Sequence, residues 1–126
     1  MSVYLIAEAA SAHDGDLTKA LRLIRESASA GADAVKFQWW SDADMLADRR
    51  RVPDYYRAIY HKYRMPWSWL ADLKQECAYA NVDFLCTTYL ASDVFVVAPY
   101  VKAMKVASFE ANDRAFLDAN RAPGKP

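Results

Sequence analysis

Four short apolar runs, separated by segments of helical periodicity, constrain the fold of this chain more than any other feature. The runs lie at 3–7, 34–38, 83–87 and 103–107. Short continuous apolar runs are typical of strands that are buried on both faces. Strands that alternate with helices pair in parallel through right-handed crossovers. The sequence therefore predicts four β/α units built on one parallel sheet.

The first helix has the clearest signals. Asp16 can cap it, and Gly31 can end it. Its apolar stripe follows helical spacing and comprises Leu17, Leu21, Ile24 and Ala28. The other expected helices lie around 54–63, from Pro66 to Asn81, across 91–101 and from a cap at Asn112.

Two architectures fit this order: an open doubly wound sheet and part of a (β/α)8 barrel. The nucleotide-binding open sheet needs a glycine-rich first turn. Here that turn, "AEAASAHDGD", contains only Gly15, and the whole chain has three glycines. A complete barrel needs about 250 residues. We therefore expect residues 1–126 to form a partial TIM (β/α)8 barrel, roughly its first four β/α units with parallel strands.

Composition excludes some classes of protein and partner. The chain is 54% hydrophobic and 25% charged, with a formal net charge of zero, so we expect no nucleic acid and no membrane as partner. No apolar run approaches the length of a membrane span, and the first residues show no signal peptide. Cys77 and Cys86 fall in an expected helix and strand, which favours packed, reduced thiols and a cytoplasmic location.

Polar residues follow in series at the carboxyl ends of the expected strands, where parallel α/β folds build their sites. They are Glu8, Lys36, Gln38, Thr87, Thr88, Lys105, Ser108 and Glu110. Lysines and hydroxyls near helix N-termini can bind a phosphate or a carboxylate, and carboxylates can act as acid or base. At any single position a solvent-directed lysine or a helix-capping hydroxyl is the commoner role. The four strand ends together favour an anion site.

Other polar and aromatic residues leave their roles open. His13 fits either a turn or a site, and His61 has the surroundings of a surface residue. The tryptophans at 39–40 and the tyrosines that follow them could line a pocket or cover a core. The arginines at 49–51 are expected in a solvated loop, although on a substrate-binding loop they could meet an acidic group.

Five motifs resemble those of the N-acetylneuraminate (sialic acid) synthase family, in that family's order. They are "IAEAASAHDGD", "AGADAVKFQ", "VDFLCTTY", "MKVASFE" and "APGKP". The second matches the family's second-strand motif residue for residue. The resemblance covers nearly the whole chain and implies the first half of the family's barrel.

The resemblance implies an enzyme that condenses phosphoenolpyruvate with an N-acetylated amino sugar such as N-acetylmannosamine. The product is a nine-carbon 2-keto acid, and phosphate is released. Carried over by motif, the positions that bind phosphoenolpyruvate are Lys36, Thr87, Lys105 and Ser108, with Gln38 lining the same pocket. The acidic active-site positions are Glu8 and Glu110, with Glu8 handling water or a proton, and His13 falls in the first-strand motif.

The resemblance also implies parts that we do not expect in this chain. The family's divalent metal (Mn2+ or Mg2+) is held by histidines of the second half of the barrel. A C-terminal antifreeze-like domain completes the sugar site across a homodimer. We therefore expect residues 1–126 alone to be inactive, with no metal ligands of their own.

Departures from the family pattern fall beside the expected site. Ala9 and Ala10 replace Ile-Gly, Thr88 replaces a proline, and Phe109 replaces a glycine next to Glu110. The bulk of Phe109 can reshape the sugar end of the pocket. Two alternatives remain: a non-catalytic half-barrel that associates with itself or another chain, and a lyase or aldolase that forms a Schiff base through a lysine.

Overall fold

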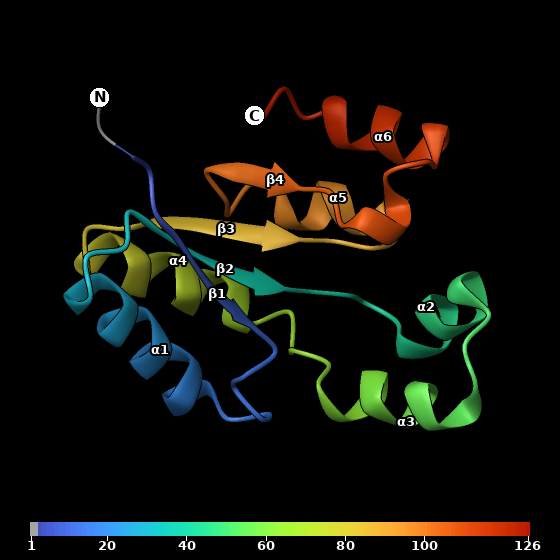
Figure 1. The fold of residues 1–126 in the computed structure, drawn as a ribbon, viewed down its shortest axis with the longest axis horizontal. Helices are drawn as coiled ribbons and strands as arrows, with labels where there is room; N and C mark the ends of the chain where they lie inside the picture. The colour runs from blue at the N-terminus through green and yellow to red at the C-terminus, as the bar shows by residue number, and fades with distance from the viewer. Residues whose placement is uncertain (1–2) are drawn as a thin grey trace.

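A computed structural model describes residues 3–126, in which four parallel strands form one sheet in the order β1-β2-β3-β4 (Figure 1). The strands are β1 (Ile6–Ala10), β2 (Ala34–Gln38), β3 (Asp83–Thr87) and β4 (Ala103–Lys105). Each pairs with the next strand along the chain in parallel. This sequential order is that of the first four strands of a (β/α)8 barrel.

The connections are helical, as the periodicity predicts, although the sequence pattern did not predict the helix at 43–50. The helices are α1 (Leu17–Ser29), α2 (Ala43–Arg50), α3 (Asp54–Lys62), α4 (Trp69–Tyr79), α5 (Ala91–Val97) and α6 (Arg114–Arg121), with a single 3-10 turn η1 (Ser108–Glu110). α1 packs beside α4 on one side of the sheet, whereas α2 and α3 lie beyond the arrowheads of the strands (Figure 1). The long segment between β2 and β3 therefore places two short helices at the carboxyl end of the sheet.

The core lies between the sheet and the pair α1 and α4. Val35 and Phe37 of β2, with Phe84 and Cys86 of β3, face the helices from alternate strand positions. The helices meet them with residues such as Ile24, Leu70, Leu73 and Cys77. Full burial of one such apolar side chain contributes about 1.5–3 kcal/mol. Both cysteines are free and buried, which confirms the prediction of packed thiols.

The helix caps follow the sequence signals in part. Asp16 caps α1 by accepting hydrogen bonds from the amides of Thr18 and Lys19, and Gly31 follows the helix with a positive φ of 91° that favours glycine. The expected cap at Asn112 is wrong by one residue, because the Asp113 carboxylate accepts the hydrogen bond from the Phe116 amide.

The first strand differs from the expectation in position and in burial. It was expected at 3–7, but pairing begins at Ile6, opposite Ala34. Before that point the backbone of Leu5 is hydrogen-bonded to Asp33. The Leu5 N–H donates to the Asp33 carboxylate at 2.7 Å, and the Asp33 N–H donates to the Leu5 carbonyl. Glu8 therefore lies inside the strand. β1 is an edge strand, so its sequence is largely exposed rather than buried on both faces.

The fourth strand is shorter than predicted, and the helix that was expected from Pro66 begins later than that proline. β4 ends at Lys105, not at residue 107, and leads into η1. α4 begins at Trp69, because the turn after Pro66 precedes it. Both differences concern element ends, where local signals compete with tertiary contacts.

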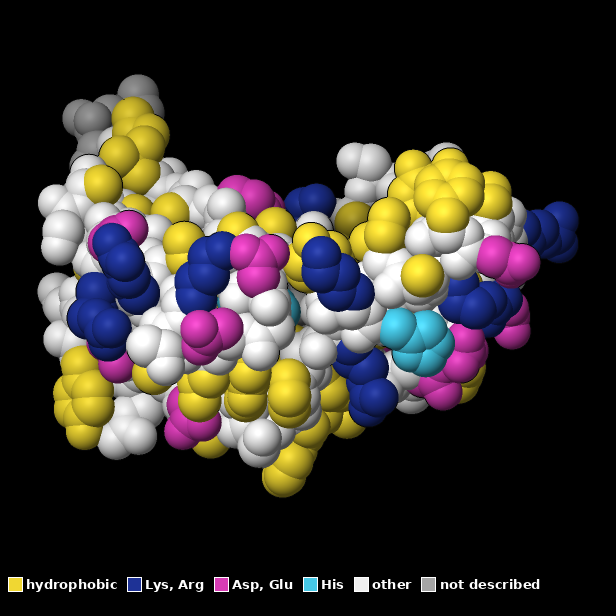
Figure 2. All heavy atoms as spheres, turned by 90° about the horizontal axis from the view of Figure 1, so that it is seen from below, with side chains coloured by type: hydrophobic (Ala, Val, Ile, Leu, Met, Phe, Trp, Pro, Cys, Tyr) yellow, Lys and Arg dark blue, Asp and Glu magenta, His cyan; other side chains and the backbone are white. Residues whose placement is uncertain are grey.

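Charges of both signs are interspersed across the face that α1 and α3 form, seen from below in Figure 2. Several of these charges are paired along or between helices, such as Arg22 with Glu26 and Arg57 with Asp44. Within residues 3–126, no helix has the length and apolar content that a membrane crossing needs.

Candidate active site

Two rows of residues cross the sheet on the face opposite the helical core. In the first row, the strand register places Lys36 between Glu8 and Leu85. In the second row, two residues further along each strand, Thr87 lies between Gln38 and Lys105. We call Glu8, Lys36, Gln38, Thr87 and Lys105 the polar face. In a barrel this face points to the interior, and its carboxyl end forms the active-site mouth.

Lys36 is buried, with 8% of its surface exposed. Its ammonium donates a hydrogen bond to Glu8 Oε2 from the neighbouring strand. Glu8 Oε1 accepts a further hydrogen bond from the Ala10 amide at 3.1 Å, and the Glu8 side chain is half exposed. The lysine is thus a fixed positive charge inside the polar face, and it does not extend to the surrounding solvent as a solitary surface lysine would.

The second row carries polar atoms that are free for a ligand. Ser11 donates its hydroxyl to Gln38 Oε1 at 3.2 Å, which fixes that amide at the end of β2. The hydroxyls of Thr87 and Thr88 are buried and have no hydrogen-bond partner among residues 3–126. A buried hydroxyl without a partner is costly. These two hydroxyls are therefore available to a ligand or to water that can supply the missing bond.

Lys105 and Ser108 are exposed at the end of β4 and in η1. Lys105 lies in register with Thr87, so two lysines and a buried hydroxyl share one face of the sheet. Ser108 opens η1, one short step beyond that row. The structure therefore brings Glu8, Lys36, Gln38, Thr87 and Lys105 together as predicted from the strand ends.

Glu110 is fully buried and engaged by a residue that the sequence reasoning placed elsewhere. Arg50, the last residue of α2, donates from Nε and Nη2 to Glu110 Oε1 at 3.0 and 2.8 Å and from Nη2 to Oε2 at 2.9 Å. Burial opposes the charge of Arg50, but hydrogen bonds to Tyr60 and Glu110 outweigh it and raise the pKa of the guanidinium. The expectation of a solvated arginine loop is wrong for Arg50.

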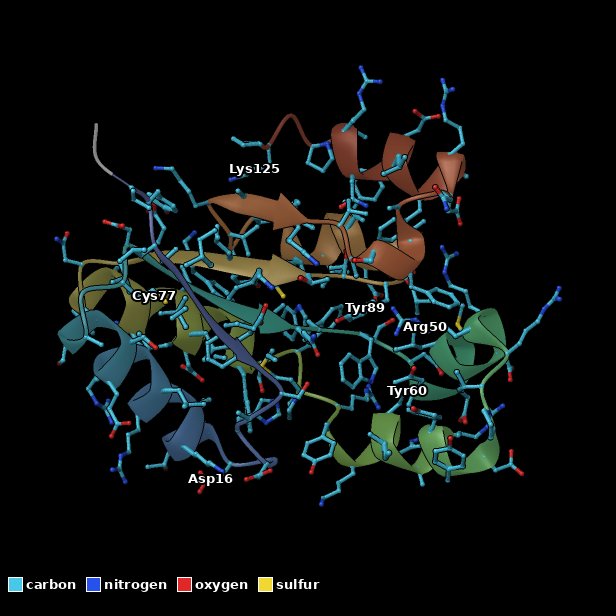
Figure 3. The ribbon with its side chains drawn as sticks, viewed as in Figure 1. Asp16, Arg50, Tyr60, Cys77, Tyr89 and Lys125 are labelled. Atoms are coloured by element: carbon cyan, nitrogen blue, oxygen red, sulfur yellow. The ribbon has the colours of Figure 1, made fainter. Side chains whose placement is uncertain are left out.

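Aromatic rings border the guanidinium on two sides. Its central carbon lies 4.7 Å from the ring centroid of Tyr89 and 4.8 Å from that of Phe109. Such cation–π contacts restrict the position of the charged group. Phe109, where the resembled family has glycine, is thus one of the two rings that contact the Arg50 guanidinium. Figure 3 shows Arg50, Tyr60 and Tyr89 gathered beyond the carboxyl ends of the strands.

A pocket of about 260 Å3 opens at this end of the sheet. Its polar lining includes Ser11, Gln38 and Arg50, and its apolar and aromatic lining is Trp40, Leu46, Ile59, Tyr60, Tyr63 and Tyr89. Of the aromatic residues that were expected either at a pocket mouth or over a core, Trp40, Tyr60 and Tyr63 line this pocket. Trp39 lies in the main core, whereas Tyr55 and Tyr56 are exposed. Trp40 and Tyr89 are buried in a small cluster, and Tyr60 and Tyr63 pack against it.

A buried carboxylate secures the loop that leads from β2 into α2. Asp93, in the first turn of α5, accepts hydrogen bonds from the Ser41 amide at 3.0 Å and the Ser41 hydroxyl at 2.6 Å. Burial raises the pKa of Asp93, and the bonds from Ser41 oppose that shift. These hydrogen bonds fix the segment after Trp40, which leads into α2, the helix that carries Arg50.

His13 is buried in the loop between β1 and α1. Its Nδ1 accepts a hydrogen bond from the Gly15 amide at 3.0 Å, and its ring meets Trp69 edge-on with centroids 5.5 Å apart. Burial lowers the pKa of His13. These contacts are those of a turn residue, and a contact of His13 with substrate stays a prediction. His61 is exposed and pairs with Asp44, as expected of a surface residue.

A larger hollow, about 770 Å3, lies at the opposite, amino end of the strands, and Asp33, Asp83 and Lys102 are among its lining residues. Parallel α/β folds place their chemistry at the carboxyl ends, so we assign the site to the polar face and the smaller pocket. No group of three or more histidine, cysteine, aspartate or glutamate side chains within residues 3–126 could hold a metal ion.

These strands define the class of the protein: half of a TIM-type barrel, with two lysines on the polar face of its sheet. The chain belongs to the NeuB family, whose model matches residues 23–126. The resemblance to sialic acid synthases is thereby confirmed. The only sequence signal for Arg50 as a site residue is its place on the segment that follows the buried strand at 34–38.

Relatives and solved structures agree with this membership. The spore coat polysaccharide biosynthesis protein SpsE of Bacillus subtilis is 35% identical over 91% of this chain and 33% of its own length. A pseudaminic acid synthase of Campylobacter jejuni is 27% identical over 98% of the chain and 39% of its own. This chain thus spans between a third and two fifths of these relatives.

The solved structure of an N-acetylneuraminic acid (sialic acid) synthetase from Leptospira borgpetersenii, in complex with citrate, superposes with a TM-score of 0.89 at 27% identity. The superposed region covers 99% of this chain and 43% of the synthetase chain. A truncated 3-deoxy-D-arabino-heptulosonate 7-phosphate synthase from Thermotoga maritima, 10% identical, shares the fold with a TM-score of 0.69 over 98% of this chain and 38% of its own. The predicted partial TIM barrel is confirmed.

Proposed function

We propose that residues 1–126 belong to a sugar-acid synthase that condenses phosphoenolpyruvate with an N-acetylated amino sugar and releases phosphate. One observation carries the proposal: Lys36 is buried on the polar face beside Glu8, with Lys105 and Thr87 in the adjoining row. Membership of the NeuB family and relatives named as sugar-acid synthases support it.

Phosphoenolpyruvate fits the charge and hydrogen bonding of the polar face. The molecule carries a phosphate and a carboxylate, and Lys36 and Lys105 offset this negative charge while Thr87 and Ser108 offer hydroxyl donors. In our proposal the Thr87 hydroxyl, which is buried without a partner among the described residues, donates to one of these anionic groups.

In the proposed reaction, C3 of phosphoenolpyruvate attacks the aldehyde carbon of the sugar and a carbon–carbon bond forms. The aldehyde oxygen becomes a hydroxyl by taking up a proton. Water adds at C2, and the C2–O bond to phosphate breaks to leave the 2-keto acid. Glu8, half exposed and held by Lys36, is the carboxylate placed to accept a proton from that water.

The sugar lies in this proposal against the pocket next to Gln38. The family resemblance implies a divalent metal that polarises the aldehyde oxygen. Residues 3–126 gather no set of side chains that fits such an ion, so the proposal assigns metal binding to no residue of this chain. It also assigns no residue of this chain to the homodimer contact or to the antifreeze-like domain that the family resemblance implies.

Substitution of Lys36 tests the proposal in the natural protein that carries this chain. We expect Lys36→Ala and the length-preserving Lys36→Met to raise the KM for phosphoenolpyruvate by about 10- to 100-fold, as loss of a charge-assisted hydrogen bond predicts. Steady-state kinetics with phosphate release as the readout measures the change.

Lys102→Ala is the matched control, because Lys102 is an exposed lysine just before β4, at the opposite, amino end of the sheet. It should leave both Michaelis constants unchanged. An unchanged KM for phosphoenolpyruvate in both Lys36 variants would refute the role of Lys36, and absence of phosphate release from the parent protein with any N-acylated amino sugar would refute the proposed reaction.

A further inference from the structure

The edge strand β1 lies beside β2 (Figure 1), and a β-bulge interrupts the ladder between them. Glu8 pairs with Lys36, but the next pair joins Ala10, and not Ala9, to Phe37. β1 therefore contains one extra residue just before its end. Bulges are frequent next to active sites, where they redirect a side chain.

The bulge decides which residue at the end of β1 faces Gln38. In a regular ladder Ala9 would pair with Phe37, and Ala10 would come opposite Gln38. The extra residue shifts the register by one, so that Ser11 comes opposite Gln38 instead. The Ser11 hydroxyl donates to Gln38 Oε1 at 3.2 Å. The bulge thus places a hydroxyl, and not the methyl group of an alanine, beside the Gln38 amide.

The backbone of the bulge has an uncommon conformation. Ala10 has a positive φ of 48°, in the left-handed region that residues with a Cβ seldom adopt. Its N–H donates to Glu8 Oε1 at 3.1 Å, on the carboxylate that also accepts a hydrogen bond from Lys36. Conformations of this kind persist only where their surroundings hold them, and they cluster at functional sites. One carboxylate therefore supports both the bulge and the buried lysine of the polar face.

The hydrogen bond from Ser11 determines what the Gln38 amide offers to a ligand. The acceptor oxygen and the donor nitrogen of a glutamine amide have nearly the same shape, so either can face a site. Because Oε1 accepts from Ser11, the amide presents its N–H donors to a ligand. Gln38 shares its row with Thr87 and Lys105, which can also donate hydrogen bonds. A row of donors suits an anion, whereas an amide oxygen turned toward that anion would repel it.

We propose that Ser11 is a positioning residue that holds the Gln38 amide with Nε2, and not Oε1, toward the anionic groups of phosphoenolpyruvate. The bulge in β1 places Ser11 for this role. The inference rests on the proposed function, whose phosphoenolpyruvate site it extends by one residue. The family resemblance assigns roles to Glu8 and His13 of the same motif and none to Ser11.

Loss of the Ser11 hydroxyl tests this role in the natural protein. We expect Ser11→Ala to weaken calorimetric binding of phosphoenolpyruvate by about 3- to 10-fold, the effect of one net hydrogen bond. The KM for phosphoenolpyruvate should rise while kcat at saturation is retained, because the amide orientation affects binding and not the chemical step. Ser11→Thr keeps the hydroxyl and should restore binding.

Ser29→Ala is the matched control. Ser29 is an exposed serine and the last residue of α1, the helix that packs on the other face of the sheet. Its replacement should leave phosphoenolpyruvate binding unchanged. Equal binding by Ser11→Ala and by the parent protein would overturn the role of Ser11.

A double-mutant cycle with Gln38→Met separates positioning from direct contact. Gln38→Met keeps the length of the side chain and removes both polar groups of the amide. If Ser11 acts through that amide, adding Ser11→Ala to Gln38→Met causes no further loss of phosphoenolpyruvate affinity. A second, additive loss would show that Ser11 contacts the ligand itself, and the positioning role would be wrong.

A matched pair of substitutions at Ala10 tests the bulge. Glycine suits a positive φ, so Ala10→Gly should bind phosphoenolpyruvate at least as tightly as the parent protein does. Valine opposes a positive φ because it is β-branched, so Ala10→Val should weaken binding in the same direction as Ser11→Ala. If Ala10→Val has the circular dichroism and the phosphoenolpyruvate affinity of the parent, the bulge does not place Ser11.

Direct binding measurements keep this inference distinct from the proposed reaction. Phosphoenolpyruvate binding that weakens in Ser11→Ala, in a protein without phosphate release, would sustain the role of Ser11 and reject the synthase reaction. Binding that weakens in Lys36→Met but not in Ser11→Ala would reject the role of Ser11 and leave the proposed function in place.

Discussion

At the scale of single residues, burial decides the protonation of His13. The side chain has no exposed surface, its Nδ1 accepts the Gly15 amide, and its Nε2 has no partner among the described residues. Desolvation disfavours the imidazolium and lowers the pKa of His13 from its ordinary value of 6.5. The folded protein therefore holds this histidine neutral at a pH where the unfolded chain protonates it.

The sign of the resulting pH dependence follows from linkage. Between the lowered folded pKa and 6.5 the unfolded chain binds more protons, so the stability that His13 contributes at neutral pH is lost as the pH falls below 6.5. We expect urea unfolding to give a smaller free energy at pH 5.5 than at pH 7.5. His13→Asn, which can keep an acceptor for the Gly15 amide, should flatten this slope.

His61→Asn is the control for the same substitution at an exposed histidine, and it should leave the slope of the parent protein in place. A slope that persists in His13→Asn would mean that another group causes it.

The two basic residues of the site show what the sequence could and could not indicate. Lys36 stands inside a short apolar strand, where period-two alternation fixes its face, so its direction was predictable. Arg50 ends a helix in a long polar excursion and reaches Glu110, which lies 60 positions further along the chain. No local pattern encodes a contact at that separation, and the three consecutive arginines gave no reason to choose the middle one.

At the scale of elements, the clamp between Asp93 and Ser41 joins α5 to the loop before α2. Removing the buried carboxylate leaves the Ser41 amide and hydroxyl without their acceptor. We expect Asp93→Ala to lower the free energy of unfolding by about 1–3 kcal/mol. We also expect it to raise the KM for the sugar, because α2 lines the pocket against which the proposed function places the sugar. Denaturant unfolding and steady-state kinetics give the two readouts.

A double-mutant cycle checks that the effect passes through this contact. Ser41→Ala removes only the hydroxyl bond and should cost less than Asp93→Ala, and the double variant should cost less than the sum of the two. Strict additivity would show that the two residues act independently.

Element boundaries show where local patterns lose to long-range contacts. The strand β2 was predicted at its observed bounds because it is central and pairs on both sides. The bounds of β1 shifted because the Asp33 carboxylate and backbone bind Leu5 before the ladder begins. The apolar run at 3–7 alone carries no information about that partner.

At the scale of the whole molecule, the sheet has two edge strands within the described residues, and at the β4 edge only the Met104 N–H has a backbone partner, the Pro126 carbonyl at 2.9 Å. β1 and β4 each pair on one side only. Four apolar side chains are exposed at the start of β1 and in the segment before it, from 76% of the surface of Val3 to 49% of that of Ile6; they are Val3, Tyr4, Leu5 and Ile6. Apolar side chains next to an unpaired strand edge favour pairing with another chain. In a complete barrel both edges are paired.

We therefore expect a polypeptide of residues 1–126, produced alone, to associate in solution through these edges. Size-exclusion chromatography with light scattering should report a mass above the 14.3 kDa of one chain. Ile6→Lys places a charge on the exposed side of β1, where charged residues oppose edge pairing, and should shift the distribution toward the monomer. Thr18→Lys, on the exposed surface of α1, should not. A monodisperse monomer from the parent polypeptide would contradict the expectation, because the open edges would then be tolerated in water.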